Sequence, residues 1–132
     1  MLVVRIWLCL ALTLQPAVAM ELIAPEQFLD KAAGRTLTFR MEPSGQLVGV
    51  EQFLSRVLSV WTRADGTCTY GVITVRDGQL CFVYDDDPDV SHCWYTFIDD
   101  NGLLVGMPSD MEVQRVTKIT ETPVGCRDVP LS

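Results

Sequence analysis

The sequence predicts a mainly β protein, an antiparallel meander of about eight strands that forms a small barrel or sandwich, with a short N-terminal helix and two disulfides. Three observations support this fold class. Short runs rich in β-branched and aromatic residues recur along the chain, and turn residues separate them. A helical pattern occurs near the N-terminus. Four of the five cysteines lie between positions 68 and 126, within or just after these runs.

Turn residues divide the chain into successive expected strands. Pro-Ser-Gly occurs at 43–45, and Asp-Gly occurs at 65–66 and 77–78. Asp-Gly between two apolar runs is the strongest short hairpin signal. Asp-Asp-Asn-Gly at 99–102 precedes the last strands. The segment EQFLSRVL at 51–58 is ambiguous, because its apolar residues also fit one face of a helix. The expected strands cover residues 37–41, 47–53, 57–62, 67–76, 80–84, 92–98, 103–105 and 113–120.

The segment APEQFLDKAAG, residues 24–34, predicts a short helix. Pro25 suits the first turn, and Glu26 places negative charge at the N-terminus of the helix. Gly34 suits the position just after the helix end. We expect Phe28 and Leu29 to pack this helix against the sheet.

The first 19 residues have the features of a secretory signal peptide. Arg5 precedes an apolar run at 6–14, and Ala-Val-Ala at 17–19 supplies a small-x-small cleavage pattern. The apolar run is too short to cross a bilayer of roughly 30 Å. We therefore expect residues 1–19 to be removed and residues 20–132 to form a single β domain. That domain would be periplasmic or secreted, with no membrane span after cleavage.

The charge balance is acidic. The chain has a formal net charge of −7, which becomes −8 when Arg5 leaves with the signal peptide. Binding of nucleic acid needs a basic face, so this class of partner is excluded. The negative charge could steer the protein toward a basic envelope protein, or it could simply keep the domain soluble. The sequence predicts no cofactor.

The four cysteines that remain after cleavage predict two disulfides, as is usual in a small exported domain. The Asp-Gly turn between Cys68 and Cys81 would leave these residues about 20 Å apart along the paired strands, too far for a bond. A hairpin symmetric about Asp87 sets Cys81 opposite Cys93, about 5 Å away. We therefore predict Cys81–Cys93 and, by elimination, Cys68–Cys126.

Aspartates fill the expected tip of that hairpin, where Pro88 would shape the turn. An EF-hand would need Gly and Glu where the sequence has Val90 and Thr96. A zinc site using the cysteines and His92 lacks the C-x-x-C spacing and would need reduced thiols. No metal site is predicted, although a looser calcium site remains open. The candidate binding loop comprises Asp85, Asp86, Asp87 and Asp89.

The expected registers divide the side chains of the central hairpins between two faces. The first, taken as the core face, carries Ile73, Val75, Leu80, Phe82 and Trp94. Gly71 falls opposite Tyr84, whose ring can lie over it. The second face is also apolar, so the N-terminal helix, the C-terminal tail or a partner must cover it, unless it lines a cavity. The candidate cavity residues on this face are Tyr70, Tyr95 and Phe97.

No catalytic residue is predicted, and we expect the protein not to be an enzyme. His92 is the only histidine, and its expected position opposite Phe82 is that of an ordinary hairpin residue. No serine lies in a nucleophile elbow, and the chain has no glycine-rich phosphate loop. The carboxylates at 85–89 crowd one loop, whereas glycoside hydrolysis needs two that face each other across a cleft.

The run GRTLTF…SGQLVG…W…DGTCTYG…DGQLCFVY…CW spans about residues 34–98. It resembles a group of small exported proteins of unknown function in Gram-negative bacteria. The paired Cys-Phe-x-Tyr strand at 81–84 and Cys-Trp strand at 93–94 are its most specific part. The resemblance implies a lipocalin-like antiparallel fold and a Cys81–Cys93 bridge, and it implies no activity. The sequence departs from the group at 51–59, where a more regular strand pair is usual.

Two non-catalytic functions follow as hypotheses. The first is a protein-binding or inhibitory module, whose acidic loop would enter the active site of a basic target such as a lysozyme. The second is a carrier of one small apolar ligand, since lipocalin-like barrels can hold a molecule in their mouths. We rank the first hypothesis above the second.

Overall fold

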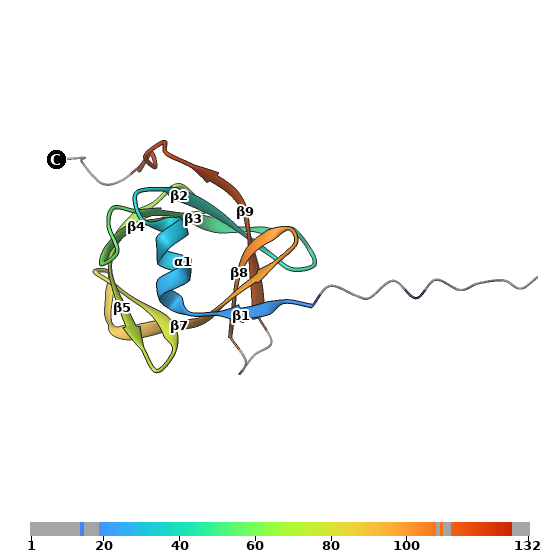
Figure 1. Ribbon diagram of the computed structural model, residues 1–132. Helices are drawn as coiled ribbons and strands as arrows, with labels where there is room; N and C mark the ends of the chain where they lie inside the picture. Colours follow the sequence, from blue (N-terminus) through green and yellow to red (C-terminus); the bar gives the residue numbers. More distant parts are fainter. Residues whose placement is uncertain (1–13, 15–18, 108, 110–111, 128–132) are drawn as a thin grey trace, which may run out of the picture.

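The structure is a computed structural model that describes residues 14, 19–107, 109 and 112–127 (Figure 1). The predicted signal peptide lies outside these residues, apart from positions 14 and 19. No helix within the described ranges is both long and apolar enough to span a membrane.

The described chain contains one helix and nine strands, and all eight expected strands are among them. The short strand β1 was not expected. The segment at 51–58 forms strand, bend and strand rather than a helix. The elements are β1 (Glu21–Ile23), α1 (Pro25–Ala32), β2 (Thr36–Met41), β3 (Leu47–Phe53), β4 (Leu58–Arg63), β5 (Cys68–Arg76), β6 (Gln79–Tyr84), β7 (Asp87–Asp99), β8 (Gly102–Met107) and β9 (Glu112–Thr120).

Strands β2 to β9 form a closed antiparallel barrel of eight strands, which confirms the predicted fold class. Each strand pairs with the next in sequence, and β9 pairs with β2 to close the ring. Strand β1 adds to the half of β7 that extends beyond its pairing with β6. The closed ring leaves the short β1 as an added strand.

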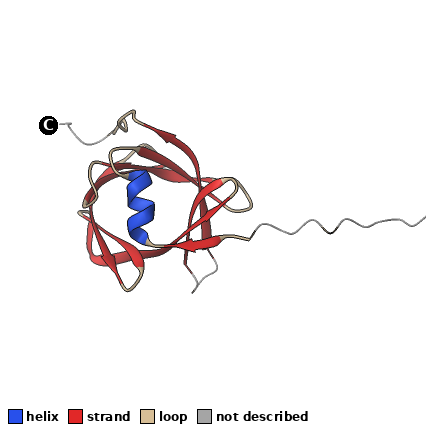
Figure 2. Cartoon of the chain, viewed as in Figure 1, coloured by secondary structure: helices blue, strands red, loops and turns tan. Residues whose placement is uncertain are grey.

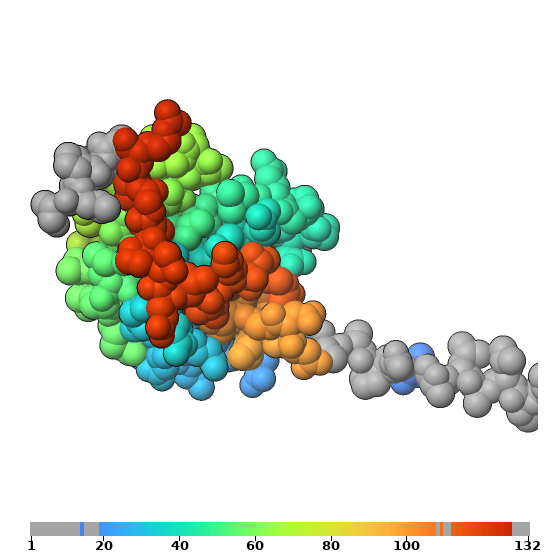
Figure 3. Space-filling model, turned by 90° about the horizontal axis from the view of Figure 1, so that it is seen from above, coloured from blue at the N-terminus to red at the C-terminus, as the bar shows by residue number. Residues whose placement is uncertain are grey.

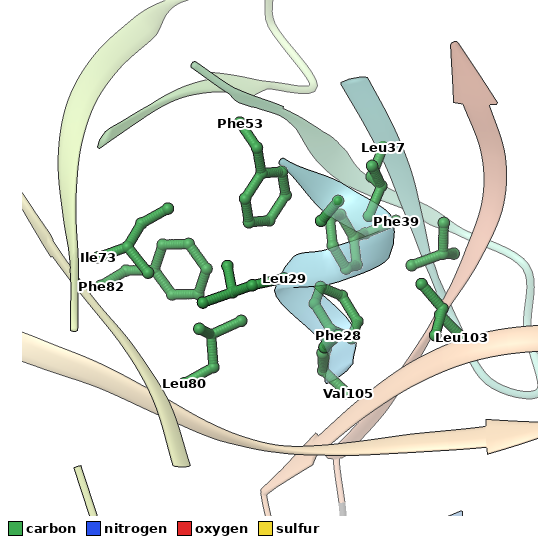
Figure 4. Close-up of a cluster of buried hydrophobic side chains, with 12 residues drawn as sticks. Phe28, Leu29, Leu37, Phe39, Phe53, Ile73, Leu80, Phe82, Leu103 and Val105 are labelled. Carbon is green, nitrogen blue, oxygen red and sulfur yellow. The ribbon is translucent and has the colours of Figure 1, made fainter. Parts of the chain in front are cut away.

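Helix α1 lies inside the ring of strands (Figures 1 and 2). Its Phe28 and Leu29 point among side chains from the surrounding strands (Figure 4), and both are buried. The rings of Phe28 and Phe53 have centroids 6.2 Å apart. The predicted helix is therefore confirmed, and it packs against the inner face of the sheet, where it forms part of the core with Leu37 and Phe53.

The two ends of the barrel differ. Only a short connection separates α1 from β2, so the C-terminus of the helix lies where β3 ends, and the Gly34 N–H donates to the Phe53 carbonyl at 2.8 Å. Arg56, in the β3–β4 connection, pairs with Asp30 of α1 at 2.8 Å. We term this the helix end. The turns β2–β3, β4–β5 and β6–β7 lie at the opposite end, termed the open end.

The predicted register of the central hairpins is confirmed, since Cys81 faces Cys93, Leu80 faces Trp94 and Phe82 faces His92. The predicted tip is wrong. A register shift after Phe82 brings Tyr84 opposite Asp87, so the turn contains only residues 85–86 and β7 begins at Asp87. Pro88 therefore lies in a strand and does not shape the turn. The shift takes up the extra residues of β7, as a β-bulge does.

Both predicted disulfides are confirmed. Cys68–Cys126 fixes the tail that follows β9 to the start of β5, and the tail crosses the outer surface (Figure 3). The Val124 N–H donates to Gln52 Oε1 at 3.1 Å. The tail thus lies over β3 and reaches the start of β5, whereas Tyr70 and Val72 on the second face of the central hairpins stay exposed.

The predicted core face is confirmed in most positions. Ile73, Leu80 and Phe82 are buried, and Trp94 packs against them. The prediction is wrong for Val75, because this side chain is 42% exposed. Residues 74–78 are all exposed, so the end of the β5–β6 hairpin lies beyond the core.

Candidate ligand-binding pocket

The barrel encloses a cavity of about 360 Å³ between α1 and the open end. Phe28 of α1 supplies part of its wall, and the remaining lining comes from the inner faces of the strands and from the β6–β7 turn. We term it the barrel pocket. Its lining residues are Phe28, Phe39, Val48, Glu51, Trp61, Arg63, Thr69, Leu80, Phe82, Tyr84, Asp86, Asp87, His92, Trp94, Val105 and Gln114.

Aromatic rings form much of the wall, and two glycines make room for two of them. Trp61 lies over Gly49, where its indole occupies the space that a Cβ would need. A Cβ on Gly71 would lie 2.8 Å from the Tyr84 ring, which confirms the predicted position of this ring over the glycine. Tyr84 also stacks on Phe82, with centroids 6.0 Å apart. The glycines on β3 and β5 therefore help to define the shape of the pocket.

Glu51 is a carboxyl group inside the barrel, and it is only 1% exposed. Its Oε2 accepts a hydrogen bond from Tyr84 Oη at 3.0 Å. Among the described residues, Glu51 Oε1 and Ser59 Oγ make no hydrogen bond of ordinary geometry, although the Ser59 hydroxyl is near enough to lower the pKa of Glu51. Burial dominates and raises the pKa of Glu51 to about 7. The pocket therefore contains an acid poised near neutral pH.

The mouth of the pocket carries charged groups. Arg63, at the end of β4, pairs with Asp86 of the β6–β7 turn, and Thr69 Oγ1 donates to the same carboxylate at 3.1 Å. Asp87 and His92 also line the cavity. The His92 ring lies 5.7 Å from that of Tyr84. These contacts hold the acidic β6–β7 turn at the mouth of the pocket.

The candidate binding loop is thus divided by its position. Asp86 and Asp87 line the barrel pocket, whereas Asp85 and Asp89 do not. All four residues are exposed. Within the described ranges no three His, Cys, Asp or Glu side chains are grouped closely enough to hold a metal ion.

The prediction of the three candidate cavity residues is wrong. Tyr70, Tyr95 and Phe97 do not line the barrel pocket. Side chains alternate along a strand, and it is the neighbours Thr69 and Trp94 that line the cavity. The face taken as core in fact supplies both the core near α1 and the pocket wall, so the cavity prediction was placed on the outer face.

Sequence reasoning missed Glu51 and Trp61. A usable signal for Glu51 was present in LVGVEQF at 47–53. Alternation along this strand places residues 49, 51 and 53 on one face, and the apolar Phe53 marks that face as internal. The helical alternative for 51–58 obscured this pattern.

Comparison with known protein families, curated proteins and solved structures finds no match to this chain. The class of protein is therefore defined by its fold and its cavity. It is an eight-stranded antiparallel β-barrel with an internal helix, two disulfides and an aromatic pocket.

Proposed function

We propose that this protein is a non-catalytic β-barrel that binds one small, largely apolar molecule in the barrel pocket. The observation that carries the proposal is the pocket itself. Its volume of about 360 Å³ lies within the range of about 300–1,000 Å³ that is usual for ligand sites. Aromatic walls with a few polar groups inside are also typical of such sites. The structure thus favours the hypothesis that sequence reasoning ranked second.

The lining residues support binding rather than catalysis. They include no serine, cysteine or lysine within the described part of the chain, so His92 has no neighbouring nucleophile of these types to activate. The carboxyl group of Glu51 is engaged by Tyr84 on one oxygen. These features can orient a ligand by hydrogen bonding and packing.

Export of the mature domain is part of the proposal. Two disulfides are typical of small domains in an oxidising compartment, and the first 19 residues have a signal-peptide pattern. The mass of the protein recovered from its own host would test this. A chain that begins at Met20 with both disulfides formed is expected, whereas a full-length reduced chain would contradict export.

Binding can be tested with the fluorescent apolar probe N-phenylnaphthylamine. We expect saturable binding of one probe per barrel, with a change in tryptophan emission because Trp61 and Trp94 both line the pocket. Trp61→Leu should weaken binding at least tenfold, since an aromatic wall is lost. Tyr70→Leu is the matched control, because Tyr70 lies outside the pocket. Absence of saturable binding, or equal loss in both variants, would refute the proposal.

Protein binding is a second candidate function, favoured by an apolar pair on the outer surface. Leu58 and Val72 face each other on β4 and β5, and each is 48% exposed.

The exposed acidic side chains of the β6–β7 hairpin form a second surface, which would suit a basic envelope protein. If the hairpin inhibits a lysozyme, replacing Asp85, Asp87 and Asp89 with serine should abolish inhibition. An unchanged inhibition constant would exclude this role of the hairpin.

A further inference from the structure

We propose that the ligand of the barrel pocket is an organic cation, an apolar molecule with one protonated amine that donates a hydrogen bond to Glu51. This inference rests on the proposed binding function and specifies its ligand class. It is carried by three features of the lining: a buried carboxyl group with an open acceptor, an excess of acidic groups and aromatic faces beside them.

The open acceptor is Glu51 Oε1. Glu51 is almost fully buried, and Tyr84 occupies its Oε2. Within the described residues Oε1 lacks a well-formed hydrogen bond, and the Ser59 hydroxyl is the nearby protein group that a ligand donor would have to replace or join. Buried polar atoms are nearly always hydrogen-bonded, and leaving one without a partner is unfavourable. A donor on the ligand would supply the missing bond, and a charged donor would give the stronger one.

The charge of the lining selects a cation over an anion. The described lining includes three carboxyl groups, Glu51, Asp86 and Asp87, and one guanidinium, that of Arg63. Arg63 already pairs with Asp86. Two carboxyl groups therefore remain to attract a positive charge or repel a negative one, and such interactions are stronger in a cavity than in bulk water.

Aromatic side chains complete the site. Trp61, Tyr84 and Trp94 share the cavity with Glu51. An ammonium group gains further attraction when it lies over the face of an aromatic ring, and Trp gives the strongest effect. Leu80 and Val105 leave an apolar surface for the body of the ligand. The pocket thus provides contacts for both halves of an amphipathic amine.

The same arrangement predicts how affinity depends on pH. Burial raises the pKa of Glu51 to about 7. At pH 5 the group is therefore mostly a neutral acid, and the carboxylate that attracts an ammonium ion forms as the pH rises. Affinity should therefore rise by up to tenfold per pH unit between about pH 5 and 7. The other titratable or charged groups that line the cavity are Tyr84, Arg63, Asp86, Asp87 and His92. Histidines in general change charge near neutral pH, so His92→Asn is the control that isolates the contribution of Glu51.

The experiment is calorimetric titration at pH 8 with three probes that share a naphthalene ring and differ in their polar group: naphthylmethylamine, naphthylmethanol and naphthoate. We expect the amine to bind at least tenfold more tightly than the alcohol and the carboxylate to bind weakest. Glu51→Gln should remove the preference for the amine while the alcohol still binds. Glu26→Gln, on the exposed face of α1, is the matched control.

The outcomes separate this inference from the proposed function. If none of the three probes binds, both fail. If the alcohol or the carboxylate binds as tightly as the amine, the cation is refuted and the apolar binding function stands. Should Glu51→Gln not fold, the pH dependence of amine binding in the wild type and in His92→Asn decides. A flat dependence in both proteins overturns the role of Glu51.

Discussion

The two ends of the barrel are enclosed by the same strands but filled in different ways. At the helix end, α1 places Phe28, Leu29 and Ala32 against Leu37 and Phe53, and each of these side chains is 3% exposed or less. Toward the open end, the strands surround a cavity of about 360 Å³ that contains a buried acid. Packing therefore stabilises one end of the interior more than the other.

The wall around the pocket is held by bonds on its outer face. Each half-cystine in a strand neighbours residues that line the cavity. Cys81 lies between Leu80 and Phe82, and Cys93 lies between His92 and Trp94. Because alternate side chains point to opposite faces, the covalent bonds stabilise the wall without filling the pocket. Side-chain packing thus stabilises the interior around α1, whereas disulfide bonds stabilise strands that form the pocket wall.

The largest effect is expected from removing packing at the helix end. Phe53→Ala should lower the free energy of unfolding by about 3–5 kcal/mol, because Phe53 is fully buried and its loss leaves a cavity. Val48→Ala, in the pocket wall, should have an effect of about 1 kcal/mol, since Val48 is only partly buried. Urea unfolding of both variants measures the difference. Equal losses would remove the distinction between the two ends.

The disulfides should be the next most important. Replacing Cys68 and Cys126 with serine should lower stability by about 4 kcal/mol, because the bond closes a loop with a sequence separation of 58. The same change at Cys81 and Cys93, separated by 12, should lower it by about 3 kcal/mol. Urea midpoints of the two double variants test this order. A greater loss from the shorter loop would contradict the chain-entropy explanation.

Glu51 should make the free energy of unfolding fall as the pH rises toward neutrality. Burial raises its pKa to about 7 in the folded protein from an ordinary value of 4.5, so the folded state binds the proton more tightly than the unfolded chain does. Its contribution to stability is therefore full below about pH 4.5 and lost as pH rises through 7, by roughly 3 kcal/mol at most. Urea unfolding at pH 5 and pH 8 should show this loss, and Glu51→Gln should reduce it. His92→Asn is the control, because histidines change charge in the same range.

The smallest effect is expected from an ion pair on the outer surface. Arg115 donates two hydrogen bonds to Asp99, at 2.9 and 2.7 Å, and holds the pKa of that carboxyl at about 2. The stabilisation is thus present above about pH 4 and lost as pH falls through 2. Asp99→Asn should lower stability by about 1 kcal/mol at pH 7 and by much less at pH 2. A difference that persists at pH 2 would assign the effect to something other than charge.

Much of the fold could be predicted because its signals are local. Alternation and Asp-Gly turns fix strands and registers, and the register alone identified the Cys81–Cys93 pair. The register shift after Phe82 could not be foreseen, because an irregular pairing of this kind has no clear local signature. The predicted tip at 85–89 therefore became a two-residue turn and the start of a strand.

The position of the pocket could not be predicted from the sequence, for a different reason. Both faces of β6 and β7 are apolar, so hydrophobicity alone could not show which face borders a cavity. That choice depends on where α1 lies, and its place inside the barrel is a tertiary arrangement. The core face was predicted correctly, but the cavity was expected on the opposite face, so Tyr70, Tyr95 and Phe97 were selected in place of Thr69 and Trp94. Glu51 was missed for the related reason that a charged residue is not expected inside a barrel.

The closure of β2 on β9 has a consequence for the order of assembly. Thr36 pairs with Thr120, so the ring cannot close until β9 is available to pair with β2, whereas α1 precedes all eight barrel strands in the chain. During oxidative refolding, trapping of free thiols should show Cys81–Cys93 before Cys68–Cys126; the reverse order would contradict this sequence of events. A nascent chain that lacks β9 therefore keeps its interior apolar surface uncovered, and it is at this stage that the protein would most need a chaperone.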